Sequence, residues 1–366
     1  MRELKVSKNE AGQRLDKLLH KYLREAGDGF IYKMLRKKNI VLNDKKATGK
    51  EMLQSGDTVK LYFSEDTFEK MGAGVTEESA PFGCKLPKDF EKWIVFQDDA
   101  LLILNKPAGV LSQSDDREKL SINEYCLQYL FEKGEVTEET LRTFKPGICN
   151  RLDRNTSGLI LFGKTLPALQ TMASILRDRS LEKYYLTVVQ GTILKSEQID
   201  GFLKKNEKDN HVSIRTTAFP GAVEIHTAYE PIAWGDLDAE CEHAVKGHQD
   251  ERDSLYDKRS GLNDARPNHV TSDFAWTLLR VHLITGKTHQ IRAHLRSIGH
   301  PIYGDPKYGD LRLNSMLEKR YGIARQLLHA YEVKFPEGLD LTVSGKSIQA
   351  LPPADFNLFT GSTLMF

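Results

Sequence analysis

The most restrictive feature of the sequence is residues 150–162, NRLDRNTSGLILF, in which one carboxylate is followed by small polar residues, a glycine and an apolar run. Four consecutive apolar residues after Gly158 predict a strand that is buried on both faces. The polar half therefore lies at the entrance of a buried strand, where the glycine and the preceding hydroxyls favour a turn. We expect Asp153 to be held at this entrance between Arg151 and Arg154.

A carboxylate between two cations has two interpretations. It can be a structural ion pair that fixes a turn, which is the commoner situation for an Asp-Arg pair. Alternatively, it can be reactive, because nearby cations lower the pKa of a carboxyl group and keep it ionised as a nucleophile or base at neutral pH. The residue types alone leave both interpretations open.

Length and composition exclude several classes of protein. The chain has 366 residues, enough for two or three domains, and its 40% hydrophobic and 28% charged residues are typical of a globular protein. It has no apolar run of roughly eighteen residues, and its first residues lack the apolar core of a signal peptide, so we expect no membrane association. Its four cysteines have neither metal-ligand spacing nor a disulfide framework, which indicates no metal site and a cytoplasmic location.

The net charge of +1 conceals an uneven distribution. Residues 1–62 hold fifteen Lys and Arg against eight Asp and Glu, and residues 285–325 hold eight against three. The compensating acidic residues lie in 64–100 and 235–273. Two basic regions are compatible with phosphate binding, although basic helices that are simply solvated give the same pattern.

Residues 11–63 predict a compact module with a helix that starts near Gly12, a second helix near 30–38, and strands near 40–45 and 58–62. The pattern RLDKLL, a basic helix, IVLN and then GDTV resembles the S-four-type RNA-binding domain. This resemblance implies that the helical face lies against RNA phosphates, where basic side chains supply affinity. The expected RNA-binding residues are Arg14, Lys33, Arg36, Lys37 and Lys38.

Four further strings carry a second resemblance. They are RLDRNTSG at 151–158, NKPAG at 105–109, EKYYLTVVQG at 182–191 and TGKTHQIRAH at 285–294. Together they resemble the RluA family of pseudouridine synthases, and the last string is highly specific for it. Two positions depart from the family pattern: Asn150 stands where the family usually has His, and Thr187 where it has Ala. The consequence of Asn150 is open.

The resemblance implies a complete catalytic arrangement. Asp153 is the expected catalytic carboxylate, Tyr185 the platform for the base, and Arg292 the guanidinium delivered to Asp153 by a strand-to-helix turn. Further substrate-binding residues are expected at Arg151, Arg154, Thr156, Lys287, His289 and Gln290. The reaction is an isomerisation, so no cofactor and no metal are expected. The implied partner is structured RNA, most of all large-subunit ribosomal RNA, and the protein is expected to be a monomer.

The expected fold class is α+β, with a mixed, largely antiparallel bent sheet and flanking helices, plus the small N-terminal domain. The expected domains are an S-four-type RNA-binding domain at 1–64, a linker at 65–90 that attaches it flexibly, and a catalytic domain at 91–366. Residues 235–273 form a polar insertion whose Cys241, His243 and His248 have no coherent ligand spacing.

Two rival functions are weighed against this one. The first is a non-catalytic RNA-binding ribosome assembly factor, suggested only by Asn150 and the insertion. The second is a carboxylate-dependent glycosidase, which would need a second, acidic carboxyl group near Asp153.

Overall fold

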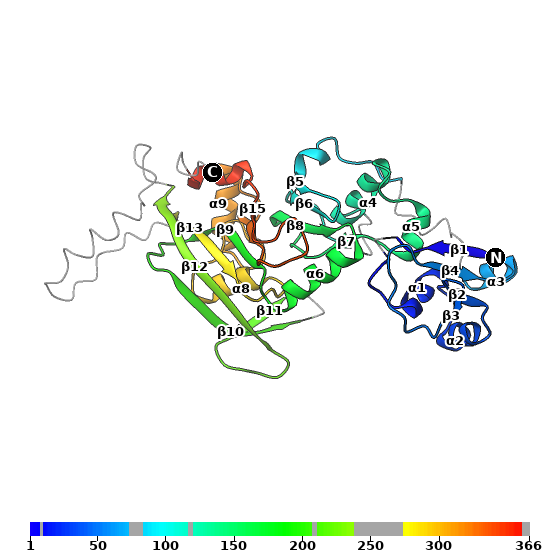
Figure 1. Ribbon diagram of the computed structural model, residues 1–366. Helices are drawn as coiled ribbons and strands as arrows, with labels where there is room; N and C mark the ends of the chain where they lie inside the picture. The colour runs from blue at the N-terminus through cyan, green and yellow to red at the C-terminus, as the bar shows by residue number, and fades with distance from the viewer. Residues whose placement is uncertain (8–9, 73–82, 116–119, 207–210, 238–273, 361–366) are drawn as a thin grey trace, which may run out of the picture.

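The computed structural model describes residues 1–7, 10–72, 83–115, 120–206, 211–237 and 274–360. It has two bodies of secondary structure, a small N-terminal module and a larger region built on one extended sheet (Figure 1). Residues 73–82 of the predicted linker and nearly all of the predicted insertion, with Cys241, His243 and His248, lie outside the described residues.

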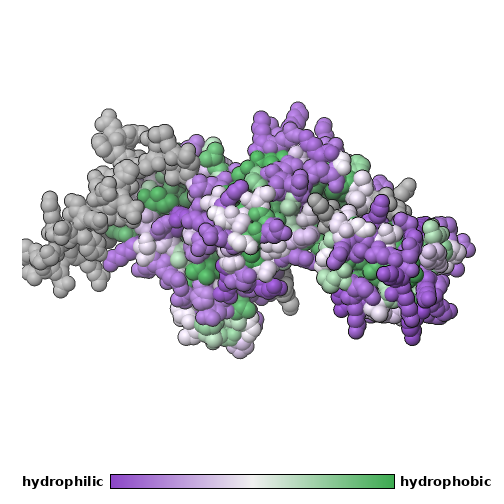
Figure 2. Space-filling view, in the orientation of Figure 1, coloured by the Kyte–Doolittle hydropathy of each residue, from purple (hydrophilic) through white to green (hydrophobic). Residues whose placement is uncertain are grey.

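The N-terminal module is a four-stranded antiparallel sheet in the order β1-β4-β2-β3, with helices packed against it. Its elements are β1 (Arg2–Lys5), α1 (Leu15–Tyr22), α2 (Asp28–Arg36), β2 (Ile40–Leu42), β3 (Lys45–Lys46), β4 (Thr58–Leu61) and α3 (Glu65–Lys70). The apolar positions three and four apart in α1 are buried, as the periodicity predicted. Figure 2 shows hydrophilic side chains over most of the visible face of this module.

The N-terminal module has an additional strand near its start and extends beyond the predicted end at residue 64. Strand β1, which was not predicted, pairs with β4 along the edge of the sheet. The linker expected from residue 65 is wrong in its first part, because Glu65–Lys70 forms α3. Phe68 of this helix is fully buried and packs on Phe63 with 5.3 Å between ring centroids. A single large aromatic side chain therefore holds six supposed linker residues on the module.

The larger region carries an 11-stranded sheet in the order β11-β10-β12-β13-β9-β14-β8-β6-β5, with β15 beside β14 and β7 beside β8. Every pairing is antiparallel except that between β14 and β8. Helices flank the sheet, so the predicted mixed, largely antiparallel α+β fold is confirmed. The strands are β5 (Ile94–Gln97), β6 (Leu101–Lys106), β7 (Gly147–Ile148), β8 (Ser157–Gly163), β9 (Glu182–Gln190), β10 (Glu197–Lys205), β11 (Val212–Arg215), β12 (Val223–Asp236), β13 (Ala275–Leu283), β14 (Leu328–Lys334) and β15 (Ser347–Gln349).

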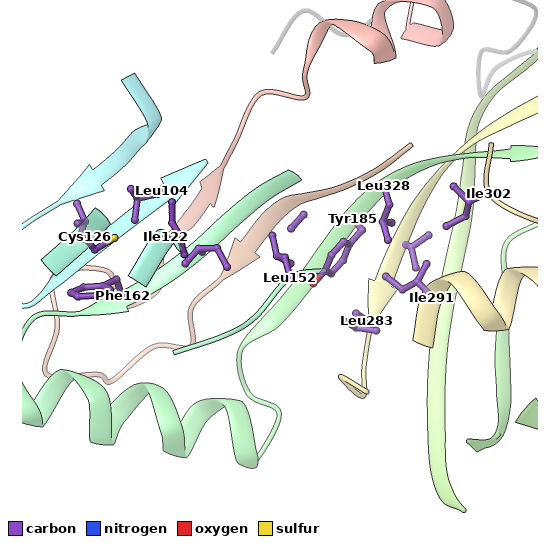
Figure 3. Packing of buried hydrophobic residues seen from close by; sticks show 14 of the residues in the cluster. Leu104, Ile122, Cys126, Leu152, Phe162, Tyr185, Leu283, Ile291, Ile302 and Leu328 are labelled. Carbon is purple, nitrogen blue, oxygen red and sulfur yellow. The ribbon is translucent and has the colours of Figure 1, made fainter. Parts of the chain in front are cut away.

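Helices cover both faces of this sheet. They are η2 (Phe90–Trp93), α4 (Ile122–Glu132), α5 (Glu138–Thr143), α6 (Leu166–Arg177), α8 (Gln290–Ser297), α9 (Leu311–Tyr321), η3 (Ala354–Phe356) and α10 (Asn357–Thr360). Figure 3 shows one buried cluster in which Ile122 and Cys126 of α4 lie near Leu104 and Phe162, and which continues to Tyr185. No helix among the described residues is long and apolar enough to span a membrane.

Strands β8, β14 and β9 form the centre of the sheet. All seven residues of β8 are buried, as its apolar run predicted. Gly158 has φ +113°, and a Cβ at this position would lie 2.3 Å from the carbonyl oxygen of Ala330 in β14. Next to it, the Ser157 hydroxyl lies 2.9 Å from His329 Nδ1. The glycine of the NRLDRNTSG string is therefore required by the close approach of two backbones, and this junction supports the segment that carries Asp153.

Candidate active site

Asp153 lies on the loop that leads into β8, and backbone contacts fix its position. The Thr156 amide donates to the Asp153 carbonyl at 3.0 Å, which closes a turn. The neighbouring Leu152 donates its amide to Ser112 Oγ at 2.9 Å, and the Ser112 hydroxyl donates to the Leu152 carbonyl at 2.8 Å. The Asp153 side chain is 28% exposed. The carboxylate is thus on a rigid support and is open to a ligand.

Arg292 joins Asp153 to a second carboxylate. Its Nη1 donates to Asp153 Oδ2 at 2.7 Å, while Nε and Nη2 donate to the two oxygens of Asp305 at 2.7 and 2.9 Å. The Arg292 side chain is 6% exposed and that of Asp305 is fully buried. The backbone amides of Lys307 and Tyr308 also donate to Asp305 Oδ1. One planar guanidinium therefore has its orientation fixed by Asp305 and presents its remaining edge to Asp153.

The hydrogen bonds between Arg292 and its carboxylates determine the charge states of Arg292 and Asp305. Burial alone would lower the pKa of Arg292, but the hydrogen bonds and charges of Asp305 and Asp153 raise that pKa above its usual value. Burial alone would raise the pKa of Asp305, but Arg292 and the two backbone amides lower it below its usual value. Arg292 is therefore a permanent cation and Asp305 a permanent anion. Asp305 has no proton to give as an acid, and its buried oxygens are already occupied.

Tyr185 forms the apolar wall of the site. It projects from β9 into the cluster that also contains Leu152, Leu328 and Ile291, and Figure 3 shows these side chains around its ring. Tyr185 is 7% exposed, and burial followed by the charge of Asp153 raises the pKa of its hydroxyl well above the usual value. The phenol therefore stays neutral near Asp153. The neighbouring Tyr184 faces the other side of the sheet, because side chains alternate along a strand.

His289 is a third neighbour of the Asp153 carboxylate. Its backbone has φ +53° at the residue before α8, and its Nε2 is 3.9 Å from Asp153 Oδ2 while Nδ1 is 3.0 Å from the Tyr308 hydroxyl. Burial lowers the pKa of His289, although Asp153 opposes this shift. A neutral imidazole can donate one hydrogen bond to a carboxylate or a substrate without adding a second full charge. Lys287, two residues earlier, is exposed.

Lys106 holds the loop that carries Asp153 through backbone hydrogen bonds. It is fully buried, and its Nζ donates to the carbonyl oxygens of Pro107, Val110 and Arg154 at 3.0, 2.9 and 3.1 Å. Burial lowers the pKa of this ammonium to about 7, while the charge of Asp153 acts in the opposite direction. The lysine of the NKPAG string therefore links the turn after β6 to the turn that carries Asp153.

Arg151 and Arg154 do not hold Asp153 between them as the sequence predicted. Arg151 and Arg154 were expected to hold Asp153 between them, but the arginine paired with it comes from α8, and Arg154 Nε donates to the Gly109 carbonyl at 3.0 Å. Both are exposed, because they lie on the outer surface of the turn.

Thr156 and Gln290, predicted to bind substrate, are each 2% exposed. Gln290 bonds to Thr285 and Thr227 and fixes the start of α8. In this structure both side chains satisfy buried polar groups, and their contact with substrate stays a prediction.

Asn150 and three further residues complete the site. The Asn150 amide donates to the Leu159 carbonyl at 3.1 Å and accepts from the Leu161 amide at 2.8 Å, so this departure from the family pattern supports β8 and leaves Asp153 untouched. Sequence reasoning missed Lys106, Asp305 and Tyr308. Lys106 belongs to the quoted NKPAG string, which was the available signal for it, whereas Asp305 and Tyr308 lie in none of the quoted strings, and residue type alone did not reveal their partners.

The predicted RNA-binding residues of the N-terminal module separate into two groups. Lys33 and Arg36 of α2, and Lys37 and Lys38 after it, are all exposed. Arg14 is paired with Asp16, which also accepts a hydrogen bond from Tyr32, so much of its charge is offset locally. Four exposed cations therefore lie in the last turn of α2 and just after it, and Arg14 is not one of them.

Comparison with known proteins identifies the class. Residues 100–297 match the family model described as RNA pseudouridylate synthase. The chain therefore belongs to the RNA pseudouridylate synthase family and is a pseudouridine synthase, as the motifs predicted. It is 28% identical over 346 residues to Ribosomal large subunit pseudouridine synthase C of Pasteurella multocida (strain Pm70), covering 91% of this chain and 85% of that protein.

Two further proteins are similar to this chain. Ribosomal large subunit pseudouridine synthase C of Vibrio cholerae serotype O1 (strain ATCC 39315 / El Tor Inaba N16961) is 27% identical over 370 residues, covering 98% of this chain and 95% of that protein. The solved structure of Human RNA Pseudouridylate Synthase Domain Containing 1 has a TM-score of 0.48 and 19% identity, covering 73% of this chain and 86% of that one.

Proposed function

We propose that this pseudouridine synthase isomerises specific uridines of large-subunit ribosomal RNA, with Asp153 as the catalytic carboxylate. The observation that carries the assignment of Asp153 is its geometry. It is a partly exposed carboxylate held at 2.7 Å by an arginine whose other edge is bound by a buried aspartate. The substrate class is supported by the names of the two bacterial relatives, which cover most of this chain.

The reaction breaks the bond between N1 of the base and C1′ of the ribose, turns the base, and joins C5 to C1′. Asp153 forms a temporary bond either to C1′ or to the pyrimidine ring, and both routes need an ionised carboxylate. C5 then loses its proton and N1 gains one, so the product has the same atoms as the substrate. Arg292 keeps Asp153 anionic and orients it, while Asp305 keeps Arg292 in place.

The uridine must leave its stack to reach Asp153, which costs a few kcal/mol. We propose that the Tyr185 ring receives the flipped base, since an aromatic face offers stacking that partly compensates this cost. His289 supplies a neutral hydrogen-bonding group next to the carboxylate. Arg151, Arg154 and Lys287, which are exposed around this position, are proposed to contact phosphates of the RNA.

The two rival functions fit the site less well. A glycosidase of the two-carboxylate type needs a second carboxyl group that can release a proton. Asp305 is the carboxylate that shares Arg292 with Asp153, but it is fully buried, its oxygens are occupied, and its pKa is lowered. A non-catalytic assembly factor would have no need for the arginine-fixed carboxylate, and Asn150 leaves that carboxylate intact.

The N-terminal module is proposed to bind RNA as an S-four-type domain through Lys33, Arg36, Lys37 and Lys38. These four cations are exposed on one end of α2 and the turn that follows. Such contacts would supply affinity without sequence information. We also propose that the protein acts as a monomer in the cytoplasm.

Tritium release from RNA labelled at C5 of uridine tests the proposed function. C5 loses its hydrogen when the new bond forms, so the release measures the reaction itself. Unmodified large-subunit ribosomal RNA and unmodified transfer RNA are compared for the wild type and Asp153→Asn. We expect release from ribosomal RNA that requires Asp153. Preferred release from transfer RNA would overturn the substrate assignment, and release by Asp153→Asn at the wild-type rate would overturn the catalytic one.

A further inference from the structure

Lys183 is a half-buried cation for which the site described above has no use. It stands on β9 two residues before Tyr185, so strand alternation places both side chains on the same face of the sheet. The packing confirms this alternation, because Tyr185 and Val189 belong to the cluster on that face while Leu186 belongs to the cluster behind the sheet. Lys183 therefore faces the side on which the base is proposed to bind.

The Lys183 ammonium reaches the loop that leads into α8. A Cβ built on Gly286 would lie 3.8 Å from Lys183 Nζ, so the amine lies against the backbone of this loop. The same loop continues through Lys287 to His289, beside Asp153. The Lys183 ammonium thus contacts the loop that carries the imidazole of the site, and Gly286 places no side chain over it.

Lys183 has no polar partner among the residues that the structure describes, either in a hydrogen bond or in an ion pair. The charges around it are also positive. Arg179, exposed in the turn between α6 and β9, acts on it electrostatically, and exposed Lys287 follows Gly286 directly. Burial, and then the charge of Arg179, lower the pKa of Lys183 below its usual value. Folding has thus removed water from an ammonium without giving it a counter-ion.

We propose that Lys183, with Arg179 and Lys287 around it, forms an anion subsite that binds one phosphodiester group of the RNA next to the flipped uridine. This inference rests on the proposed function, since it places the subsite beside the Tyr185 platform. A phosphodiester carries one negative charge and two acceptor oxygens, which match an ammonium that lacks acceptors. Lys183 is a binding and positioning residue in this arrangement, and Asp153 remains the reactive group.

A phosphate contact and a structural lysine predict opposite effects on stability. An unpaired, half-buried ammonium opposes folding, so its replacement by an apolar side chain of similar length should leave the melting temperature equal or higher. A lysine that held the fold together would lower the melting temperature when replaced. Lys183→Met distinguishes the two, and Lys183→Arg keeps the charge that a phosphate needs.

The test measures equilibrium binding of the full-length chain to in-vitro-transcribed large-subunit ribosomal RNA over a series of KCl concentrations. Asp153→Asn serves as the parent so that no turnover occurs, and Lys183→Met, Lys183→Arg and Lys319→Met are each added to it. Lys319 is an exposed lysine of α9 and is the matched control. Loss of one phosphate contact reduces the slope of log K against log salt by about 0.7–1.

We expect Lys183→Met to weaken binding about tenfold, to reduce the salt slope by this amount, and to keep or raise the melting temperature. Lys183→Arg and Lys319→Met should behave as the parent. An unchanged affinity and slope in Lys183→Met, or a lower melting temperature with an unchanged slope, would overturn the subsite. Absence of tritium release by the wild type would overturn the proposed function instead, so the two failures are told apart.

Discussion

The two aspartates that share Arg292 allow the same substitution to be made on either side of one guanidinium. Asp153 is 28% exposed and accepts one hydrogen bond from Arg292, whereas Asp305 is fully buried and accepts two. Replacing either residue by Asn removes one negative charge and preserves the shape of the side chain. The structure predicts that the two variants will fail in different ways.

Asp305→Asn should be the more destabilising variant. It removes the buried counter-ion of Arg292, and breaking a buried pair from one side costs about 3–5 kcal/mol. At about 2–4 °C per kcal/mol, the melting temperature should fall by roughly 6–20 °C. Asp153→Asn leaves both bonds between Arg292 and Asp305 in place, so it should cost only about 1 kcal/mol.

Activity should follow the opposite order. Asp153→Asn should abolish tritium release, because an amide is not a nucleophile of comparable strength. Asp305→Asn, assayed well below its melting temperature, should keep Asp153 but lose its fixed orientation, which corresponds to a loss of about 10²-fold. Thermal unfolding and tritium release measured on the same preparations provide the comparison.

One pattern of results would refute this reasoning. If Asp153→Asn lowered the melting temperature as much as Asp305→Asn and still turned over, Asp153 would be a structural ion pair. If Asp305→Asn changed the stability by less than about 1 kcal/mol, Asp305 would not be the counter-ion that the buried geometry implies.

Three further predictions follow from the supporting residues. Tyr185→Phe should keep most activity because the ring is retained, whereas Tyr185→Ala should lose both activity and about 3–5 kcal/mol of stability in chemical denaturation. Burial lowers the pKa of Lys106 to about 7 in the folded protein, so between pH 7 and about 10 the unfolded chain keeps a proton that the folded chain has lost. The unfolding free energy of the wild type should therefore rise with pH relative to that of Lys106→Met in this range. The rise should be at most about 1.4 kcal/mol per pH unit. A parallel pH dependence in the two proteins would show that Lys106 keeps an ordinary pKa. Gly158→Ala should lower the unfolding free energy by roughly 3 kcal/mol or more, because the new Cβ meets the backbone of Ala330. Gly109 has φ +89° but open space around it, so Gly109→Ala should lower the unfolding free energy by only about 1 kcal/mol. Equal losses of stability in thermal unfolding of the two variants would contradict the close approach of Gly158 to Ala330.

Local patterns were sufficient for much of the fold. The buried strand after Gly158 and the helices of residues 11–63 were predicted from residues that are neighbours in the sequence. The approach of Arg292 to Asp153 was also predicted, but through the family motif, since no periodicity relates residues that far apart.

The remaining parts of the site depend on long-range packing. An arginine next to Asp153 in the sequence was expected to pair with it, yet chain neighbours on a turn point outward while α8 brings Arg292 from the other side. Asp305 could not be recognised as the partner of Arg292 because the chain between them turns through a loop. Polar residues of a catalytic motif can also face inward, as the burial of Gln290 demonstrates.

The position of β14 has a consequence for how the enzyme is made. This strand separates β8 from β9, although Ser157 and its partner His329 are 172 residues apart. While the chain is being synthesised, β8 and β9 emerge long before the strand that must lie between them, and their facing edges cannot close on each other correctly. Asp153 and Tyr185 therefore acquire their final relation only when residues 328–334 have left the ribosome. The growing chain stays unable to modify RNA until this strand has emerged.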